Sequence, residues 1–275
     1  MFWLNLLRGL WVADSVSTPC NRDSLKTATD KYILAQNSGR ADVLTVLTSN
    51  LTYTENDVPV KINCGMLSQP LKLDHHFSIY DTTHCATFTE LIAATTEHQY
   101  VIGTRMLFTA DKISLIESII TEKGDWGFND TGGATGYLHW TLRETWDPIP
   151  KAQQDSRETI KAAGDAYLDR LGDVDVSVPW NSKCARLEGG GYTDPNNAGG
   201  NTCQNGLPST VKVTDRRYVI DEEMGVVDIF LGFPKLDRSA PQVPLPDSHL
   251  FRVEEGLIRY IHTLSACVNP GCGIS

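Results

Sequence analysis

The stretch PDSHLFRVEEGLIRYIHTLSAC, residues 246–267, contains two apolar-patterned runs joined by Glu255 and Gly256. This pattern predicts a β-hairpin with a two-residue turn. Counting outward from the turn pairs His249 with His262. Because cross-strand partners share one face of a sheet, we expect the two histidines to lie opposite each other. A slip of one residue would separate them.

Similar strand-like runs, rich in Val, Ile, Thr, Tyr and Phe, occur through most of the chain and predict further strands, although FTELIAA (88–94) is also compatible with a helix. They span residues 46–57, 71–81, 86–94, 100–110, 113–121, 216–222, 225–233, 249–253 and 257–264. Two amphipathic helices are predicted, one from Asn21 to about Gln36 and one that begins with a capping box whose N-cap is Asp155. Their apolar stripes are Leu25, Ala28, Tyr32 and Ala35, and Ile160, Ala163, Tyr167, Leu168 and Leu171.

The order of these elements repeats, which predicts an internal duplication. SLKTATDKYILA (24–35) aligns with TIKAAGDAYLDR (159–170), and each helix is followed by an irregular segment and a strand meander that ends in a hairpin. This order is typical of an α+β fold in which a curved antiparallel sheet wraps helices. We therefore predict an N-terminal apolar segment (1–19), a first half (20–125), a linker (126–154) and a second half (155–275).

Composition limits the partners. The chain has 275 residues, 41% hydrophobic and 21% charged, with a formal net charge of −10. Nucleic acids and anionic membranes are bound chiefly through basic patches, and Arg216-Arg217 is too short a basic run to form one. The Gly-rich tract from Gly189 to Gly206 lacks a nucleotide-binding signature and is expected to be a surface loop. A small molecule is therefore the expected partner.

Seven cysteines without zinc-site spacing predict disulfides and a secretory or extracellular location. The odd number leaves at least one thiol free or paired to another chain, with Cys64 or Cys272 the best candidate. Asn50 and Asn129 begin glycosylation acceptor patterns, which agree with a secretory route.

The N-terminal segment has two interpretations. It is either an imperfect signal segment, interrupted by polar residues, or an ordered helix that packs Trp3, Leu7 and Trp11 onto the domain. No other stretch is apolar and long enough to span a bilayer, so no stable membrane insertion is expected.

Several motifs carry a family resemblance over residues 20–267. They are LDHHFSIYDTTHCATFTEL, YVIGT, DSRETIKAAGDAYLD, VPWNSKCARLEGGGYT, RRYVIDEEMGVVDIF and the hairpin itself. The fold resembles a tandem of nuclear-transport-factor-2-like (NTF2-like), or SnoaL-like, cones. The motifs resemble fungal secretory proteins with an uncharacterised domain. Some similar proteins act in the secondary metabolism of tropolone sesquiterpenoids, which are meroterpenoids, where they promote a hetero-Diels-Alder reaction on a quinone methide. Cys64 and Cys272 depart from the family pattern.

We expect two disulfides. A Cys20–Cys85 bond would tie the N-terminus to the sheet, and a Cys184–Cys203 bond would close the Gly-rich loop.

His75 is the first candidate for chemistry. Strand alternation places His75 and Phe77 on the apolar face of their strand. A histidine in an apolar cavity can act as a general acid or base, while the competing interpretation is a buried histidine whose nitrogens bind backbone groups. His249 and His262, paired beside Tyr260, are further candidates or a structural pair between the halves. HxH and HExxH spacings are absent, so no metal is expected.

The segment VPWNSKCARLEGG supplies Trp180 and Arg186, which in a cone fold fall near the cavity mouth. Trp180 could stack on a planar ligand and Arg186 could hold a ligand oxygen. The alternative is a tryptophan that fills the core and an arginine paired with Glu188 or Asp169.

Three function classes follow: a cofactor-independent cyclase or lyase on an apolar oxygenated small molecule, a secreted carbohydrate-active enzyme, and a non-catalytic binding protein. We favour the first, a dehydratase/cyclase or hetero-Diels-Alderase without cofactor or metal, and a homodimer is compatible with it. We expect His75 or His262 to transfer the proton, Arg186 to stabilise an oxyanion, and four residues to contact substrate. These are Trp180, Tyr260, His249 and Phe77. The kind of cavity decides between the classes.

Overall fold

The computed structural model describes residues 20–128, 132–237, 240, 242–269 and 271–272. Asn129 and the N-terminal segment (1–19), for which a glycosylation site and a signal segment or helix were predicted, lie outside the described residues. Asn50, the other predicted glycosylation site, is exposed on a strand.

The first half is one helix and a six-stranded sheet of order β2-β1-β6-β5-β4-β3. Its elements are α1 (Arg22–Ser38), β1 (Leu47–Glu55), β2 (Val58–Pro59), β3 (His75–Asp81), β4 (Ala86–Ala93), β5 (Tyr100–Thr109) and β6 (Lys112–Thr121). Short 3-10 helices lie at Ala41–Val43 and Met66–Ser68. The run 88–94 lies in strand β4 and is not helical.

The second half repeats this architecture with the strand order β8-β7-β12-β11-β10-β9. Its elements are α3 (Arg157–Arg170), β7 (Trp180–Glu188), β8 (Gly191–Tyr192), β9 (Thr214–Asp221), β10 (Val226–Phe233), β11 (Leu245–Glu254) and β12 (Leu257–Ser265). Between the halves lie α2 (Gly133–Thr141) and a 3-10 helix, Lys151–Gln153. The identical strand order confirms the predicted duplication.

Both sheets are mixed, whereas the sequence predicted antiparallel ones. Strand β1 runs parallel to β6, and β7 runs parallel to β12. In each half the chain leaves the first hairpin, crosses to the far edge of the sheet and returns by a four-strand antiparallel meander. The last strand of the meander therefore lies beside the first strand of its half and runs parallel to it.

Both predicted helical stripes are buried, and each helix begins with a side-chain cap. Asn21 Oδ1 accepts a hydrogen bond from Ser24 N in α1, and Ser156 Oγ accepts one from Thr159 N in α3. The N-cap of α3 is thus Ser156, one residue after the predicted Asp155. Asp155 instead accepts a hydrogen bond from Gly256 N, at the turn of the β11–β12 hairpin, at 2.8 Å.

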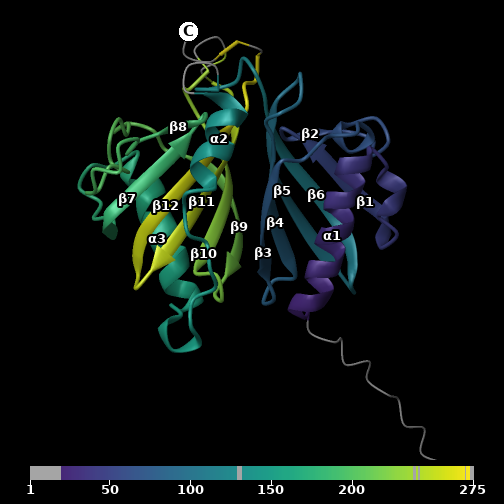
Figure 1. Cartoon of the computed structure of the whole chain (residues 1–275), viewed down its shortest axis with the longest axis horizontal. Coiled ribbons are helices and arrows are strands. Elements are labelled where there is room, and N and C mark those ends of the chain that lie inside the picture. Colours follow the sequence, from purple (N-terminus) through teal and green to yellow (C-terminus); the bar gives the residue numbers. More distant parts are fainter. Residues whose placement is uncertain (1–19, 129–131, 238–239, 241, 270, 273–275) are drawn as a thin grey trace, which may run out of the picture.

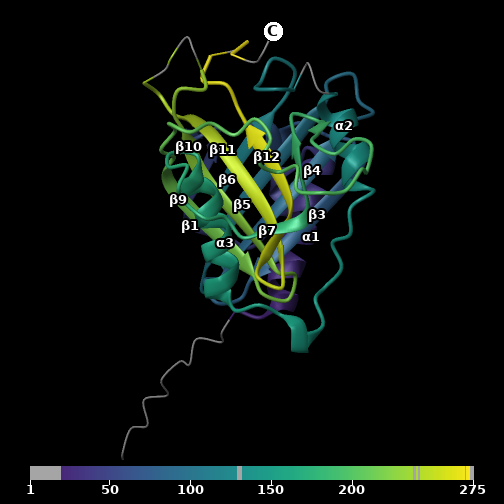
Figure 2. The same cartoon turned by 90° about the vertical axis from the view of Figure 1, so that its left-hand side faces the viewer.

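The molecule has four layers: α1, the first sheet, the second sheet and α3 (Figures 1 and 2). Each helix encloses an apolar core with the outer face of its own sheet. A third core lies between the two sheets, where Phe88 of β4 meets Phe230 of β10 edge to face with ring centroids 6.1 Å apart. Helix α2 adds Ala134 and Tyr137 to this central core.

Two reciprocal contacts join the halves. Asp81 ends β3 and Asp221 ends β9. Each carboxylate accepts a hydrogen bond from the backbone N–H of the residue before the other aspartate, at 3.1 and 2.9 Å. Each also binds the arginine that begins the other half's helix: Arg157 binds Asp81, and Arg22 binds Asp221. The halves therefore face each other with pseudo-two-fold symmetry.

The predicted register of the hairpin is wrong beyond the first pairs. Glu254 pairs with Leu257, but β12 contains a bulge at Arg259, after which His249 pairs with Thr263 and His262 with Leu250. A bulge inserts one unpaired residue, so every later side chain changes face relative to simple counting. His249 and His262 consequently lie on opposite faces of the second sheet.

Three disulfides are present, Cys20–Cys85, Cys184–Cys203 and Cys267–Cys272, and Cys64 is free and exposed. Both predicted bonds are among them, and of the two candidates for the odd cysteine it is Cys64 that is unpaired. Three disulfides are consistent with a secreted protein. None of the helices in the described part of the chain is long and apolar enough to cross a membrane.

Candidate functional site

A cavity of about 400 Å³ lies between α3 and the face of the second sheet that this helix covers. We call it the α3 cavity. Its apolar walls include Trp126, Tyr167, Leu171, Leu207, Val211 and Phe233. Its polar lining includes Arg186, Glu188, Asp247, His249, Thr263 and Ser265. Apolar walls with a few convergent polar groups are typical of small-molecule sites of 300–1,000 Å³.

The central polar group is a hydrogen-bonded chain from Ser265 through Asp247 to His249. Nδ1 of His249 lies 2.6 Å from Asp247 Oδ1, and Ser265 Oγ donates to Asp247 Oδ2 at 2.5 Å. Strand alternation places Asp247 and His249 on one face of β11. Burial raises the pKa of Asp247, and the hydrogen bonds from His249 and Ser265 oppose this rise. The Asp247 carboxylate therefore fixes the orientation of the His249 imidazole.

Aromatic rings surround this imidazole. The His249 ring centroid lies 5.5 Å from that of Tyr167, 5.9 Å from that of Phe251 and 6.5 Å from that of Phe233. Burial raises the pKa of the Tyr167 hydroxyl to about 12, so this hydroxyl is protonated at neutral pH.

Arg186 reaches the α3 cavity from β7, but most of its guanidinium N–H groups already donate hydrogen bonds to acceptors of the protein itself. Nε donates to Glu188 at 3.2 Å, and Nη1 and Nη2 donate to the carbonyl oxygens of Cys203 and Asn205 at 2.6 and 2.8 Å. Arg186 thus secures the Gly-rich loop beside the Cys184–Cys203 bond. The pairing with Glu188 is the structural alternative foreseen from the sequence.

Two polar groups of the α3-cavity lining lie on adjacent strands. Glu188 of β7 and Thr263 of β12 are register partners in the sheet. Thr263 Oγ1 is buried and has no hydrogen-bond partner within the described residues. Glu188 Oε1 accepts a bond from Trp126 Nε1 at 3.3 Å, and its side chain remains 37% exposed.

His262 lies on the other face of the second sheet, between the halves. Its Nδ1 is 3.1 Å from Glu90 of β4, and its Nε2 is 2.7 Å from Glu144, which follows α2. Glu144 also accepts a hydrogen bond from Trp146 at 3.0 Å. Burial lowers the pKa of His262, but the charges of Glu90 and Glu144 outweigh it and raise the pKa to about 10. We call Glu90, Glu144, Trp146 and His262 the His262 cluster.

The structure divides the predicted site residues between these two places. Four of them lie on the inter-sheet side, namely His75, Phe77, Tyr260 and His262. Phe77 and Tyr260 contact the Trp146 ring. Burial lowers the pKa of His75, and the charges of Glu90 and His262 also affect this pKa. Arg186 and His249 line the α3 cavity. Trp180 packs its ring against Tyr167, with centroids 5.8 Å apart, and contributes no lining.

The sequence analysis missed Asp247, Glu188, Thr263 and Tyr167 as site residues. A usable signal existed for Asp247, because it stands two positions before His249 in a predicted strand and therefore shares its face. Glu188 and Thr263 could not be linked from the sequence, because their strands are distant in the chain and pair in parallel.

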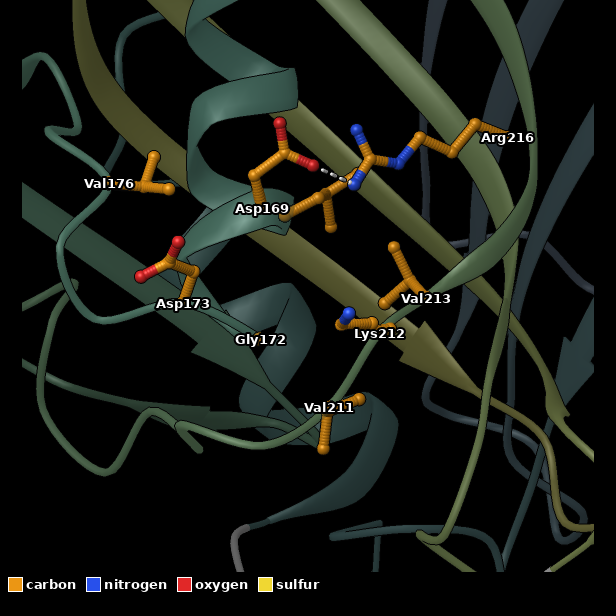
Figure 3. Close-up of a pocket in the computed structure, with 9 residues that line it drawn as sticks. Asp169, Gly172, Asp173, Val176, Val211, Lys212, Val213 and Arg216 are labelled. Carbon is orange, nitrogen blue, oxygen red and sulfur yellow. Dashed lines mark hydrogen bonds and ion pairs between the residues drawn. The ribbon is translucent and has the colours of Figure 1, made fainter.

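Two further hollows lie apart from the α3 cavity. Figure 3 shows the first, where Asp169, Gly172, Asp173 and Val176 face Val211, Lys212, Val213 and Arg216, and Arg216 pairs with Asp169 at 2.6 Å. The second is a groove where the rings of Trp140 and Tyr192 stack with centroids 4.6 Å apart. Asp194 is the single carboxylate among the described residues that line this groove.

Within the described residues, no group of three or more His, Cys, Asp or Glu side chains is arranged to hold a metal ion.

Comparison with known proteins adds one match. Residues 153–265 match a domain of unknown function, DUF8021. This range starts at the 3-10 helix before α3 and ends with β12, so it contains all the α3-cavity residues named above except Trp126. No curated protein matches the chain. The part of the chain that matches a known domain is therefore the half that contains the cavity.

Proposed function

We propose that the α3 cavity binds an apolar, oxygenated small molecule and catalyses loss of water from it by proton transfer through His249, a lyase or cyclase reaction. The observation that carries the proposal is the Asp247–His249 pair, 2.6 Å apart, opening on a cavity with aromatic and aliphatic walls. An imidazole oriented by a carboxylate is an effective general acid and base. This assignment moves proton transfer from His75 and His262 to His249, because His249 lines the cavity.

A single imidazole suffices for such a dehydration. Nδ1 of His249 is held by Asp247, which leaves Nε2 to exchange protons with a ligand. In an ortho-hydroxybenzyl alcohol, Nε2 would accept the phenolic proton and deliver it to the benzylic hydroxyl as the carbon–oxygen bond breaks. The products are one water and one ortho-quinone methide, with no net gain or loss of protons. An alkene held beside the quinone methide then closes a six-membered ring without further proton transfer.

The remaining parts of the cavity support this chemistry. The protonated Tyr167 hydroxyl and the Arg186 guanidinium place positive potential near developing negative charge. Apolar walls hold the two reactants together, and orientation alone contributes on the order of 7 kcal/mol or more to such reactions. The NTF2-like cone, the hetero-Diels-Alder form of the reaction and a secretory location are the finer parts of the proposal. The duplicated helix-on-sheet halves support the cone, and the three disulfides support the secretory location. The hetero-Diels-Alder form rests on the family resemblance of the motifs.

A carbohydrate-active function has less support. Most glycosidases use two carboxylates that flank the scissile bond. In the α3 cavity Asp247 is bound by His249 and Ser265, and Glu188 is bound by Arg186 and Trp126. The described lining of the aromatic groove offers Asp194 alone.

The test uses the whole chain with ortho-hydroxybenzyl alcohol and an electron-rich alkene, and follows formation of the chroman product. General acid–base groups contribute about 10²–10⁴-fold, so His249→Ala should reduce the rate above background at least about 100-fold. His75→Ala should retain the wild-type rate, because His75 lies outside the cavity lining. A wild-type protein without any acceleration, or a His249→Ala variant within about threefold of wild type, would contradict the proposal.

A further inference from the structure

The groove at Trp140 and Tyr192, which we call the aromatic groove, has a volume of about 510 Å³ and lies apart from the α3 cavity. It forms where α2 lies beside β7 and β8 (Figure 1). The stacked rings of Trp140 from α2 and Tyr192 from β8 form one wall. Arg143, which follows α2, and Arg259 and Tyr260 of β12 complete the part of the lining that matters here.

Two arginines in this lining have no carboxylate partner. Most arginines in the described part of the chain form an ion pair with Asp or Glu. Arg143 and Arg259 form none with the described residues, and each donates a hydrogen bond to a backbone carbonyl instead, that of His139 and that of Lys183. Because a guanidinium group carries five N–H donors, both side chains have donors left for a ligand.

The acidic groups near the groove do not cancel these charges. Asp194 lines the groove, but its carboxylate accepts hydrogen bonds from two backbone N–H groups of its own loop, at 2.9 and 3.2 Å. Glu144 lies behind the groove, is buried and binds His262 at 2.7 Å. The lining is therefore positively charged, although the whole chain has a formal net charge of −10.

The bulge in β12 brings one of the arginines into the groove. In a regular strand Arg259 and Tyr260 would point to opposite faces of the sheet. A bulge changes the direction of the side chain at the extra residue, so both residues line the groove. The guanidinium carbon of Arg259 lies 4.1 Å from the centroid of the Tyr260 ring, and that of Arg143 lies 5.9 Å from the centroid of the Trp140 ring. Cation–π attraction therefore helps to hold both guanidinium groups in place.

The architecture of a half does not require these side chains. Strand register gives each of Tyr192, Arg259 and Tyr260 an equivalent position in the first half. Small or aliphatic residues occupy these positions, namely Pro59, Ser114 and Leu115. The same strands and the same bulge thus form without aromatic or cationic residues there. Packing of the sheet alone does not explain why the second half has them.

We propose that the aromatic groove binds a planar aromatic carboxylate, with the carboxylate between Arg143 and Arg259 and the ring along the wall of Trp140 and Tyr192. Guanidinium groups form paired hydrogen bonds with carboxylates, and aromatic side chains supply flat apolar contact area for a ring. An acidic sugar shares the charge, but it also needs acceptors for its hydroxyl groups, and the carboxylate of Asp194 is used by its own loop. This site does not depend on the function proposed for the α3 cavity.

The experiment is a calorimetric titration of the whole chain with 2-naphthoate and with its neutral analogue, 2-naphthamide. Hydrogen bonds to charged groups are stronger than those between neutral groups, so wild type should bind the carboxylate at least about tenfold more tightly. Arg143→Gln and Arg259→Gln should each weaken naphthoate binding at least about fivefold and change naphthamide binding by less than about twofold.

Two control variants assign the binding to the groove. Arg170 also lacks an ion-pair partner among the described residues but lies outside the groove, on α3. Arg170→Gln should leave naphthoate affinity unchanged, which separates a site from general attraction of anions. Thr263→Val changes the lining of the α3 cavity and should also have no effect. Each variant is first checked for its thermal midpoint, and the exposed Arg143 provides the decisive variant if Arg259→Gln does not fold.

Four outcomes would overturn the inference. The first is absence of saturable naphthoate binding to wild type, and the second is equal affinity for naphthoate and naphthamide. The third is a loss of affinity in Thr263→Val but not in Arg143→Gln, which would place the ligand in the α3 cavity. The fourth is tighter binding of D-galacturonate than of 2-naphthoate, which would make the ligand an acidic sugar.

Discussion

His249 and His262 are chemically identical residues that stand in one hairpin and have different environments. His249 has one carboxylate partner and lines a cavity, while His262 has two and is buried between the halves. The difference comes from one bulged residue, Arg259, which turns the two side chains to opposite faces. An imidazolium between two carboxylates is a structural bridge, since all its donors are used. An imidazole with one nitrogen bound can still exchange protons.

The His262 cluster should make stability depend on pH. The folded-state pKa of about 10 exceeds the unfolded value of about 6.5, so the stabilisation is complete below about pH 6.5 and is lost as pH rises toward 10. His262→Gln should lower the free energy of unfolding by about 3 kcal/mol at pH 6, because it leaves Glu90 and Glu144 without a cation. The deficit should narrow toward pH 10.

Urea unfolding across this pH range measures the effect, with the exposed His76→Gln as the control. Parallel pH profiles for wild type and His262→Gln would show that folding does not raise the pKa of His262.

At the level of elements, the hairpins of the two halves share a local irregularity. The bulge at Arg259 in β12 has a counterpart at Ser114 in β6, and both follow a two-residue turn in the left-handed region, Ala110-Asp111 and Glu255-Gly256. Such bulges increase strand twist, which suits a sheet that packs against a helix on one face and a second sheet on the other. The repetition indicates that the bulge belongs to the architecture of each half.

Helix α3 also offers a test at this scale. Ser156→Ala removes the side-chain acceptor for Thr159 N and should cost about 1 kcal/mol of unfolding free energy. Chemical denaturation of the variant beside an exposed serine change, Ser177→Ala, measures this cost. An unchanged midpoint for Ser156→Ala would mean that the cap contributes nothing and that α3 is held by packing alone.

For the whole molecule, the reciprocal arginine–aspartate contacts hold one half to the other. Asp81 is fully buried and Asp221 nearly so, while Arg157 is 15% exposed and Arg22 is 28% exposed at the side chain. The duplication makes the two contacts equivalent in position, but the Arg157 side chain is less exposed to solvent than the Arg22 side chain. Their energies should therefore differ although their geometry is alike.

Arg157→Ala should cost about 3 kcal/mol, because it leaves the buried Asp81 carboxylate without its guanidinium. Arg22→Ala should cost about 1 kcal/mol, since water reaches Asp221 more easily once the arginine is gone. Unfolding free energies of the two single variants test the order. Equal costs would show that solvent exposure does not distinguish the two contacts.

Local sequence patterns were sufficient to predict much of the secondary structure of this protein and its internal repetition. Apolar periodicity placed both helices with their buried stripes and the nine predicted strands, and similarity between the two helix regions predicted the duplication. Cysteine positions predicted two of the disulfides. These features depend on neighbours in the chain, which is why the sequence carries them. Strand β7 was missed, because polar residues interrupt the apolar pattern of its run WNSKCARLE. These polar residues are buried or paired only through tertiary contacts, which the sequence does not reveal.

The sequence by itself determined the elements and their repetition; the tertiary structure decided which side chains meet. The bulge at Arg259 reverses the faces of all later residues in β12, and it leaves no signature that simple counting detects. The parallel pairing of β7 with β12 brings Glu188 beside Thr263, and the crossing chain brings Glu144 to His262. Candidate sites depend on such contacts between distant segments, and the register that creates them is set by packing of the whole sheet.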